Sequence, residues 1–249
     1  MNNKILKKIC GIFGFRLIDK KLFKNNRLIS THSTLSIKTI LTELFNQKKI
    51  NSIIQIGAND GVIFDELNEF INKYKIKSLL VEPIKYNFEK LRNKYRQTDF
   101  IKLENSAILI DEQFSYLYKV DEKYLIYYDK HIPGITSFDK SHLLNHGVKK
   151  KHIIKEKVNS INVNELLSKY DIKNLDLFYT DTEGYDGKII MDFLINTNFR
   201  PVIIFEYIHI NSEIFHTLLL KLTSENYKIF SVNENAVCIP NSIKLSINF

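Results

Sequence analysis

Short apolar runs alternate along the chain with longer segments in which apolar residues recur every three or four positions. The runs have the length of strands, and the longer segments have the period of amphipathic helices. Strands without polar alternation are usually buried on both faces, which is typical of a parallel sheet with helices on each side. The pattern predicts strands at residues 52–57, 77–82, 100–103, 175–180 and 202–207.

The alternation of strands and helices predicts a doubly wound, mostly parallel α/β fold. No internal repeat and no Gly- or Pro-rich linker divides the chain, so we expect a single domain. Residues 111–160 are less regular and rich in Tyr, His and Lys. Loops of this length are often functional, so we expect this segment to shape a ligand pocket, with tyrosines that either stack on a ring of the ligand or fill a core. Helices are predicted at 35–49, 62–74, 86–95, 163–169 and 211–222, and a terminal hairpin at 227–232 and 236–239.

The formal charge of +8 is concentrated at the N-terminus. The first 50 residues hold eleven Lys or Arg and two Asp or Glu, so the rest of the chain is nearly neutral and a nucleic-acid-binding body is not favoured. We divide the chain into a basic, amphipathic, helical extension at 1–34 and a domain at 35–249. Residues 1–28 either pack their apolar side on the domain, which is the commoner arrangement, or contact an anionic membrane surface or a lipid-linked substrate.

The sequence also bears on the compartment. No apolar run reaches the eighteen or so residues of a membrane-spanning helix, and the N-terminus lacks a small-residue cleavage site. Cys10 and Cys238 are far apart and form no CxxC pair, which fits a reducing environment. We therefore expect a cytoplasmic protein. Peripheral contact with the inner membrane is the alternative that the basic extension leaves open.

The carboxyl ends of the strands form the ligand-binding edge of a doubly wound sheet. After the first strand, Gly57 and Gly61 enclose the turn GANDG, where a following helix could direct backbone amides at a carboxylate or phosphate. After the second strand, Glu82 is placed to accept hydrogen bonds from both hydroxyls of an adenosine ribose. The pair indicates NAD or S-adenosylmethionine, although GxGxxG and phosphate-loop motifs are missing.

Three further strand ends carry polar residues. The polar and small residues at 105–107 would let an adenine ring pack closely. The fourth strand ends in DTEGYD, where Asp181 and Glu183 could form a general base, a divalent-metal site or a clamp for sugar hydroxyls. Glu206 follows the apolar run of the fifth strand, where an unpaired buried carboxylate would be costly, so we expect it to belong to the site.

The segments IIQIGANDG, LLVEP, ENSAI, LDLFYTDTEGYD and VIIFEY, in this order and spacing, resemble the FkbM-domain family of S-adenosylmethionine-dependent methyltransferases. The resemblance covers residues 35–210. It implies a class I, Rossmann-like fold with seven mainly parallel strands and one antiparallel strand near the C-terminus. It also implies methylation of a hydroxyl, foremost one of a sugar or glycan, in the biosynthesis of a surface polysaccharide or a secondary metabolite. The implied cofactor residues are Gln55, Gly57, Ala58, Asn59, Asp60, Gly61, Glu82, Pro83, Asn105, Ser106 and Ala107.

The same resemblance places Asp181 and Glu183 at the methyl-transfer centre. We expect Asp181 to take or orient the proton of the acceptor hydroxyl, with Glu183 and Glu206 in support. Neutral imidazole also suits this task near pH 7. The rival bases are His131, His142 and His209.

One position departs from the wider class. Gln55 stands two residues before the first glycine, where many class I methyltransferases have an acid; it can accept a hydrogen bond but carries no charge. Two other functions stay open: an NAD(P)-dependent oxidoreductase, whose ribose Glu82 would equally bind, and a non-catalytic binding module. The presence of a divalent metal and the oligomeric state are also left open.

Overall fold

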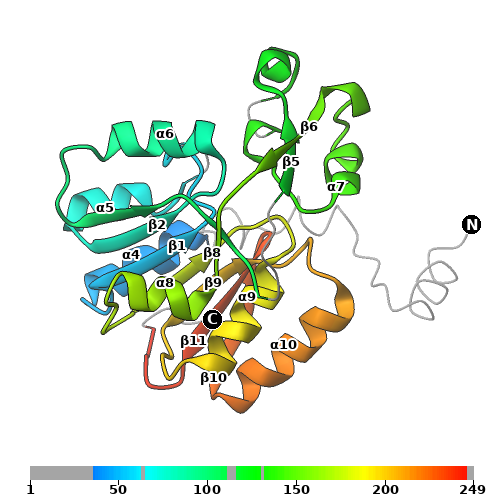
Figure 1. Cartoon of the computed structure of the whole chain (residues 1–249). Helices are drawn as coiled ribbons and strands as arrows, with labels where there is room; N and C mark the ends of the chain where they lie inside the picture. Colours follow the sequence, from blue (N-terminus) through cyan, green and yellow to red (C-terminus); the bar gives the residue numbers. More distant parts are fainter. Residues whose placement is uncertain (1–35, 63–64, 111–115, 130–131, 246–249) are drawn as a thin grey trace, which may run out of the picture. The chain divides into compact units, whose positions relative to one another are not determined.

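A computed structural model describes residues 36–62, 65–110, 116–129 and 132–245. Its centre is a seven-stranded sheet in the order β10-β11-β9-β8-β1-β2-β3 (Figure 1). Neighbouring strands are parallel except that β11 is antiparallel to both β9 and β10, which confirms the predicted mostly parallel sheet. The strands are β1 Ser52–Ile56, β2 Lys77–Val81, β3 Ile101–Glu104, β8 Leu177–Thr180, β9 Val202–Glu206, β10 Tyr227–Val232 and β11 Asn235–Pro240.

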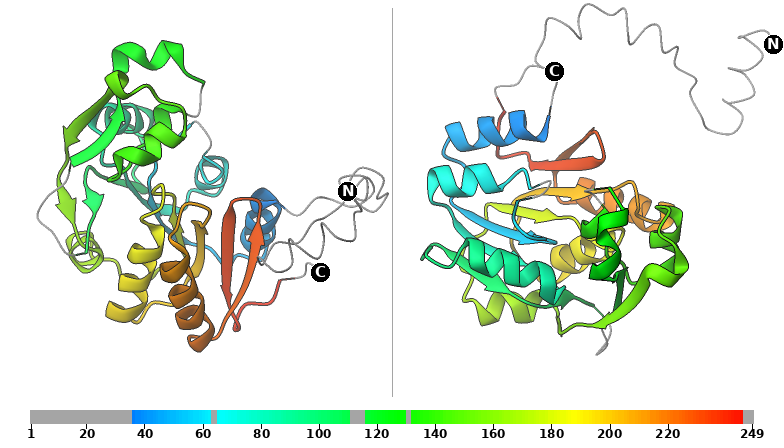
Figure 2. Two further views of the ribbon diagram at one scale, coloured as in Figure 1. Left: turned by 90° about the vertical axis from the view of Figure 1, so that its right-hand side faces the viewer. Right: turned by 90° about the horizontal axis from the view of Figure 1, so that it is seen from above.

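Helices cover both faces of the sheet (Figure 2). On one face, α8, α9 and α10 share a core with the strands, in which Ile54, Phe178 and Phe205 are almost completely buried. On the other face α4 lies against α5, where Phe45 stacks on Phe70 with ring centroids 4.9 Å apart. The helices are α4 Ile37–Asn46, α5 Asn68–Tyr74, α6 Lys85–Lys94, α8 Val163–Lys169, α9 Asp186–Asn196 and α10 Ser212–Ser224.

Helix α5 begins at Asn68, six residues later than the apolar pattern predicts. Asp65 Oδ1 accepts hydrogen bonds from the backbone N–H groups of Leu67 at 2.9 Å and Asn68 at 3.1 Å. These bonds satisfy donors that the first turn of a helix leaves unpaired, so they favour a helix start at this point. The glycine turn after β1 therefore does not lead directly into a helix.

No helix is predicted over 186–196, but the structure forms α9 there, directly after the DTEGYD segment. Ile189, Ile190 and Phe193 recur at helical spacing and are buried in the core. The acidic turn thus joins a buried strand to a buried helix. Because both of these elements are packed in the core, the two ends of the turn are held in place.

The irregular segment forms a small antiparallel pair, β5 Tyr116–Val120 with β6 Ile153–Lys157, and the short helix α7 Lys140–Asn145 (Figure 1). Tyr118, Tyr124 and Tyr128 pack against its own apolar core, and a 2.7 Å hydrogen bond joins the Tyr128 hydroxyl to His152 Nδ1. These three tyrosines therefore fill a core. Short elements complete the segment: β4 Ala107–Ile108, β7 Ser160–Ile161, η1 Glu122–Tyr127, η2 Ile132–Gly134 and η3 Lys150–His152.

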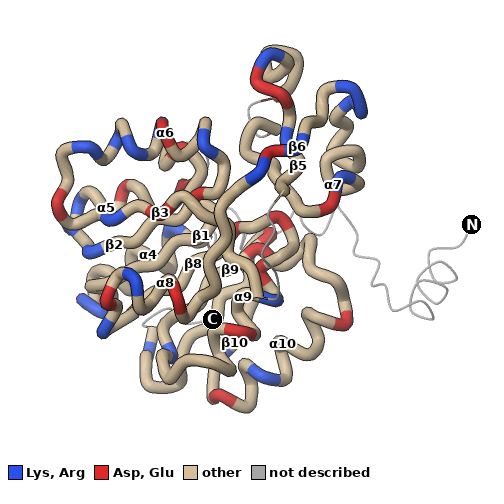
Figure 3. Tube along the Cα trace, viewed as in Figure 1, with Lys and Arg blue, Asp and Glu red and all other residues tan. Residues whose placement is uncertain are grey.

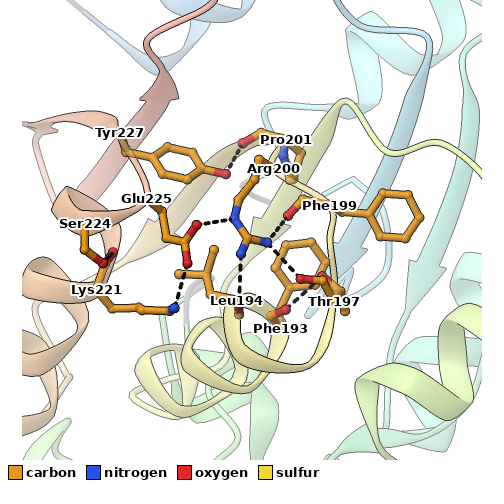
Figure 4. Close-up of polar contacts among 10 residues, drawn as sticks. All are labelled: Phe193, Leu194, Thr197, Phe199, Arg200, Pro201, Lys221, Ser224, Glu225 and Tyr227. Carbon is orange, nitrogen blue, oxygen red and sulfur yellow. Dashed lines mark hydrogen bonds and ion pairs between the residues drawn. The ribbon is translucent and has the colours of Figure 1, made fainter.

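A polar cluster holds the amino end of β9 (Figure 4). The Arg200 guanidinium donates to the carbonyls of Leu194, Thr197 and Phe199, at 3.1, 2.9 and 2.7 Å, and so closes the C-terminal end of α9. Its Nε donates to Glu225 Oε2 at 2.8 Å, next to the end of α10. One side chain thus ties two helix ends to the start of a central strand.

The predicted extension at 1–34 lies outside the described residues, as do Cys10 and His131. Membrane contact by the extension therefore stays a prediction. In the part of the chain that the structure describes, no helix is both long enough and apolar enough to cross a membrane.

Candidate active site

A cavity of about 580 Å³ opens at the carboxyl ends of the central strands. The chain runs outward from β1 through β2 and β3 and returns on the other side of β1 as β8, so the strand order switches between β1 and β8. Ile56 at the end of β1 is in register with both Val81 and Thr180, which brings the three strand ends together. The cavity therefore lies at the switch point, where doubly wound sheets bind their ligands.

Most of the residues that the sequence singles out line this cavity. Those from the ends of β1, β2 and β3 and the loops that follow them meet those from the ends of β8 and β9. The lining includes Gln55, Gly57, Ala58, Asn59, Glu82, Pro83, Ser106, Ala107, Asp181, Glu183 and Glu206.

Four of the described residues that the sequence singles out are not part of the lining: Asp60, Gly61, Asn105 and His142. Asn105 Nδ2 donates to the backbone carbonyl of Glu82 at 2.8 Å, so it holds the end of β2 in place. Gly61 has a φ of +70°, and a Cβ there would come within 2.7 Å of the Leu91 side chain. The glycine therefore permits close packing on α6, and the structure gives it no place against a ligand.

Gly57 is required by the contact between β1 and β8. Its φ is +84°, and a Cβ at this position would lie 1.9 Å from the Asp181 carbonyl oxygen. Only glycine fits such a conformation and such a close approach. The first glycine of the turn thus brings the predicted cofactor loop directly against the predicted catalytic loop.

The backbone amides of the glycine turn are bonded within the protein. Gly57 and Ala58 both donate to the Val81 carbonyl at 3.0 Å, and Asn59 donates to Glu82 Oε2 at 2.9 Å. Together with the late start of α5, this corrects the expectation that these amides face an anionic group. The turn instead positions side chains and fixes Glu82.

Glu82 is held rigidly at the tip of β2. Its Oε1 accepts the N–H of Ile84 at 2.9 Å and its Oε2 accepts the N–H of Asn59. The residue is only 4% exposed, and burial raises its pKa to about 7 despite these bonds. The Asn87 side chain also donates to this carboxylate, which still leaves acceptor capacity for a ribose hydroxyl. That role stays a prediction.

The DTEGYD loop is shaped by its own last residue. The fully buried Asp186 accepts the Thr182 N–H with both carboxylate oxygens at 3.2 Å, which closes the loop at the start of α9. Glu183 has a φ of +55°, an unusual conformation for a non-glycine residue. At Gly184 a Cβ would lie 2.8 Å from the His209 carbonyl oxygen. The loop after β8 is therefore packed tightly against the loop after β9.

The cavity is strongly acidic. Figure 3 shows acidic segments near the ends of β8 and β9. Among the described lining residues none is Lys or Arg. Burial, and then repulsion from Asp181 and Glu183, raises the pKa of Glu206 to about 9. Desolvation by the cavity walls, and then repulsion from Asp186 and Glu183, raises the pKa of Asp181, although solvent in the cavity still reaches this side chain. The acidic lining residues are Asp65, Glu66, Glu82, Asp181, Glu183, Glu206 and Glu234.

Several buried polar atoms at the cavity have no partner among the described residues. They include Gln55 Oε1, Asp65 Oδ2 and Glu206 Oε2. A buried acceptor without a donor costs free energy, about 1–3 kcal/mol each, unless something binds there. Gln55 is only 4% exposed, and its side chain hydrogen-bonds Asp65. An acid, Asp65, thus lies beside Gln55 in the cavity lining, and sequence reasoning missed it.

Three histidines gather beside Glu183. His142 Nε2 lies 2.6 Å from Glu183 Oε2, and His209 Nε2 lies 3.9 Å from the same oxygen. His146 completes the group, with its ring centroid 4.6 Å from that of His142. Burial lowers the pKa of His209. His142 and His209, which the sequence suggests as separate bases, are thus neighbours, whereas His146 is missed although the HLLNH spacing puts it on one helical face with His142.

The strand order, the switch-point cavity, the glycine turn and the carboxylate at the tip of β2 together define a class I methyltransferase fold of the Rossmann-like type. The chain belongs to the FkbM methyltransferase domain family, whose model matches residues 55–229. Membership implies methyl transfer, with S-adenosylmethionine as the expected methyl donor.

Comparison with solved structures yields relatives in fold alone. The methyltransferase FkbM from Methylobacillus flagellatus KT is 12% identical with a TM-score of 0.46, and the match covers 76% of this chain and 43% of that one. The METTL16 methyltransferase domain is 12% identical with a TM-score of 0.44, covering 81% and 65%. The human methyltransferase 10 domain containing protein is 12% identical with a TM-score of 0.41, covering 84% and 83%. No curated protein matches the chain in sequence.

Proposed function

We propose that this protein is an S-adenosylmethionine-dependent O-methyltransferase that acts on a hydroxyl of a sugar or glycan without phosphate groups. The observation that carries the proposal is the charge of the cavity. Acidic side chains come from the ends of four strands, and none of the described lining residues is Lys or Arg. The raised pKa values of Asp181 and Glu206 keep part of this lining protonated at neutral pH; a cationic ligand favours ionisation of these acids, whereas an anionic ligand opposes it.

The lining suits the cationic methyl donor better than a dinucleotide. S-adenosylmethionine carries a sulfonium and an ammonium group, and the unpartnered Gln55 Oε1 and Asp65 Oδ2 provide acceptors for the ammonium. Glu82 would hold the ribose, and Ala107 and Ile108 offer small apolar contacts for adenine. Among the described lining residues a pyrophosphate would find no Lys or Arg, and the amides of Gly57, Ala58 and Asn59 are bonded within the protein. These features count against NAD as the ligand.

The chain's own residues can prepare a hydroxyl for methylation. When bound, the donor supplies the methyl group, and its sulfur leaves as a neutral thioether. Asp181 would accept the hydroxyl proton as the oxygen–carbon bond forms, and its raised pKa makes the carboxylate a stronger base than an ordinary aspartate. Thr182, bonded to Asp186, holds the loop that carries Asp181, so that the base stays in position.

The cavity also restricts the acceptor. A phosphorylated sugar or nucleotide sugar would bring negative charge next to Asp181, Glu183 and Glu206. We therefore expect a neutral polyol or glycan end. Phe138, Leu117 and Ile135 from the irregular segment line the cavity and provide apolar surface for a ring face.

A radiolabel assay tests this function. The protein would be incubated with methyl-labelled S-adenosylmethionine and matched pairs of neutral and phosphorylated sugars and glycans. We expect label on the neutral acceptors in a form that survives alkaline hydrolysis, as a methyl ether does. Label that alkali releases as methanol, as from a carboxyl ester, or label on nitrogen, would contradict O-methylation of a hydroxyl.

A further inference from the structure

We propose that His142, His146, Glu183 and His209 bind one divalent first-row transition-metal ion beside the methyl-transfer centre. The four side chains come from three separate segments: α7 with its C-cap, the loop after β8 and the loop after β9. One potential ligand atom from each lies within 4.8 Å of all the others. This convergence is not a product of neighbouring sequence positions, since Glu183 and His209 are far from α7 in the chain.

The spacing is close to that of a metal site. An ion with bonds of about 2.1 Å places adjacent ligand atoms about 3 Å apart and opposite ones about 4.2 Å apart. His142 Nε2 lies 2.6 Å and His209 Nε2 lies 3.9 Å from Glu183 Oε2, and all four ligand atoms lie within 4.8 Å of one another. Small side-chain rotations therefore suffice to seat an ion among the four groups.

The backbone holds two of the ligands in place. Glu183 adopts a positive φ, a conformation that costs free energy and is typical of functional loops. Gly184 lets this loop approach the His209 backbone so closely that a Cβ would lie 2.8 Å from its carbonyl oxygen. His142 and His146 lie one helical turn apart, an arrangement that presents two imidazoles on one side, and the His146 N–H bonds to the His142 carbonyl. The backbone conformation therefore fixes where these side chains start, which favours their convergence.

The ligand set indicates the class of ion. Three imidazoles and one carboxylate suit Zn²⁺, Fe²⁺, Co²⁺ or Ni²⁺, whereas Mg²⁺ and Ca²⁺ prefer oxygen ligands. The side chains of His142, Glu183 and His209 are 14%, 18% and 22% exposed, so the group is sheltered but reachable. His146, Glu183 and His209 also line the cavity, which leaves a coordination position facing its interior.

The ion would supply the positive charge that the cavity walls lack. An acceptor oxygen bound to it would lose its proton more readily, because a metal-bound hydroxyl has a lowered pKa. Glu183 is two residues from Asp181, so the ion and the base would act on the same hydroxyl. This role rests on the proposed function, but the metal site itself does not.

Metal binding can be measured without methyl transfer. The full chain, stripped with a chelator, would be titrated with Zn²⁺, Co²⁺ and Mg²⁺ by calorimetry, and Co²⁺ binding would be followed by its visible absorption. We expect one Zn²⁺ or Co²⁺ per chain and much weaker binding of Mg²⁺. His146→Gln and His209→Gln should each weaken Zn²⁺ binding by more than about 100-fold, since loss of even an outer-shell partner costs 10–100-fold.

The exposed His216 on α10 provides the matched control, because His216→Gln should leave Zn²⁺ affinity unchanged. Circular dichroism and binding of S-adenosylhomocysteine would show that each variant is folded. If the stripped protein binds no Zn²⁺ stoichiometrically, or if His146→Gln and His209→Gln bind it as wild type does, the cluster is a metal-free histidine–carboxylate group and the proposal is overturned. Neither outcome depends on finding the acceptor.

Discussion

Strand β9 has two polar ends that differ in kind. At its amino end, Arg200 and Glu225 form an ion pair in which the arginine donates to three further carbonyls (Figure 4). At its carboxyl end, Glu206 is buried among other acids, and its Oε2 has no partner among the described residues. The pKa values record the same contrast. Hydrogen bonds from Arg200 and Lys221 lower the pKa of Glu225 to about 2, whereas burial raises that of Glu206 to about 9.

The comparison distinguishes polar groups whose hydrogen bonds stabilise the fold from polar groups that keep an acceptor available for a ligand. Satisfied polar groups close helix ends and stabilise the protein, but they leave nothing to bind another molecule. Unsatisfied carboxylates destabilise the fold and gain stability only when a cation arrives. The polar groups at the amino end of β9 therefore stabilise the fold, and we expect those at its carboxyl end to bind a ligand. A single substitution at each end can test this difference.

The largest effect is expected from Asp181→Asn. The amide keeps the shape of the side chain but cannot take the hydroxyl proton, so methyl transfer should fall by about 100- to 10,000-fold. Binding of S-adenosylhomocysteine should change little in the same calorimetric titration. The exposed Asp99 provides a control, since Asp99→Asn should leave the rate unchanged. Near-normal turnover of Asp181→Asn would remove this residue as the base.

At the other end of β9, Arg200→Met should destabilise the fold by about 2–3 kcal/mol, because three carbonyls lose their donor and Glu225 loses its closest charge partner. Chemical denaturation would measure the change. Arg200→Lys should recover only part of it, since an ammonium cannot reproduce the fork of donors. Activity per folded molecule should stay the same. A stability equal to that of wild type would show that this cluster is not structural.

Glu206→Gln should have the opposite sign and stabilise the apo protein by about 1 kcal/mol, because at pH 8 the ionised carboxylate of the unfolded chain must take up a proton to enter the cluster of acids, whereas a glutamine need not. The measurement is denaturation at pH 8 in the presence of a chelator. Glu213 lies exposed in the first turn of α10, so Glu213→Gln should give no gain. A loss of stability in Glu206→Gln would mean that the carboxylate is satisfied and would break the contrast.

The smallest expected effect is a change in how the free energy of unfolding depends on pH below pH 4.5. Since the pKa of Glu225 is lowered from 4.5 to about 2, its ionic bonds stabilise the fold above pH 4.5, and this contribution is lost as the pH falls through about 2. The free energy of unfolding should therefore fall less steeply between pH 4.5 and 2 in Arg200→Met than in wild type. Parallel slopes in the two proteins would show that Arg200 does not hold this pKa down.

The sequence predicts the sheet well because its signal is local. Short apolar runs such as 202–205 have the length of buried strands, and the glycines and acids that follow them lie at one edge once the strands are parallel. The start of α5 is predicted wrongly because Asp65 replaces the glycine turn as the point where the helix is capped. Helix α9 is not predicted because the acidic turn directly before it is interpreted as a loop, although apolar residues recur at helical spacing after that turn.

The site is predictable only in part because its decisive contacts join distant segments. That Gly57 touches the Asp181 backbone follows from strand order, not from either sequence segment. The pairing of Gln55 with Asp65 likewise depends on the course of the loop between them. The spacing of His142 and His146 is visible in the sequence, but only the fold brings Glu183 and His209 to them.

Ligand choice is the most direct test of the account. Calorimetric titration of the chelator-treated protein with S-adenosylhomocysteine and with NAD compares the two adenosine compounds that Glu82 could serve. We predict saturable, one-to-one binding of S-adenosylhomocysteine, a loss of at least about 10-fold in affinity in Glu82→Ala, and no binding of NAD. Binding of NAD in preference to S-adenosylhomocysteine would contradict the claim that the acidic cavity at the carboxyl ends of β8 and β9 is a methyl-donor site.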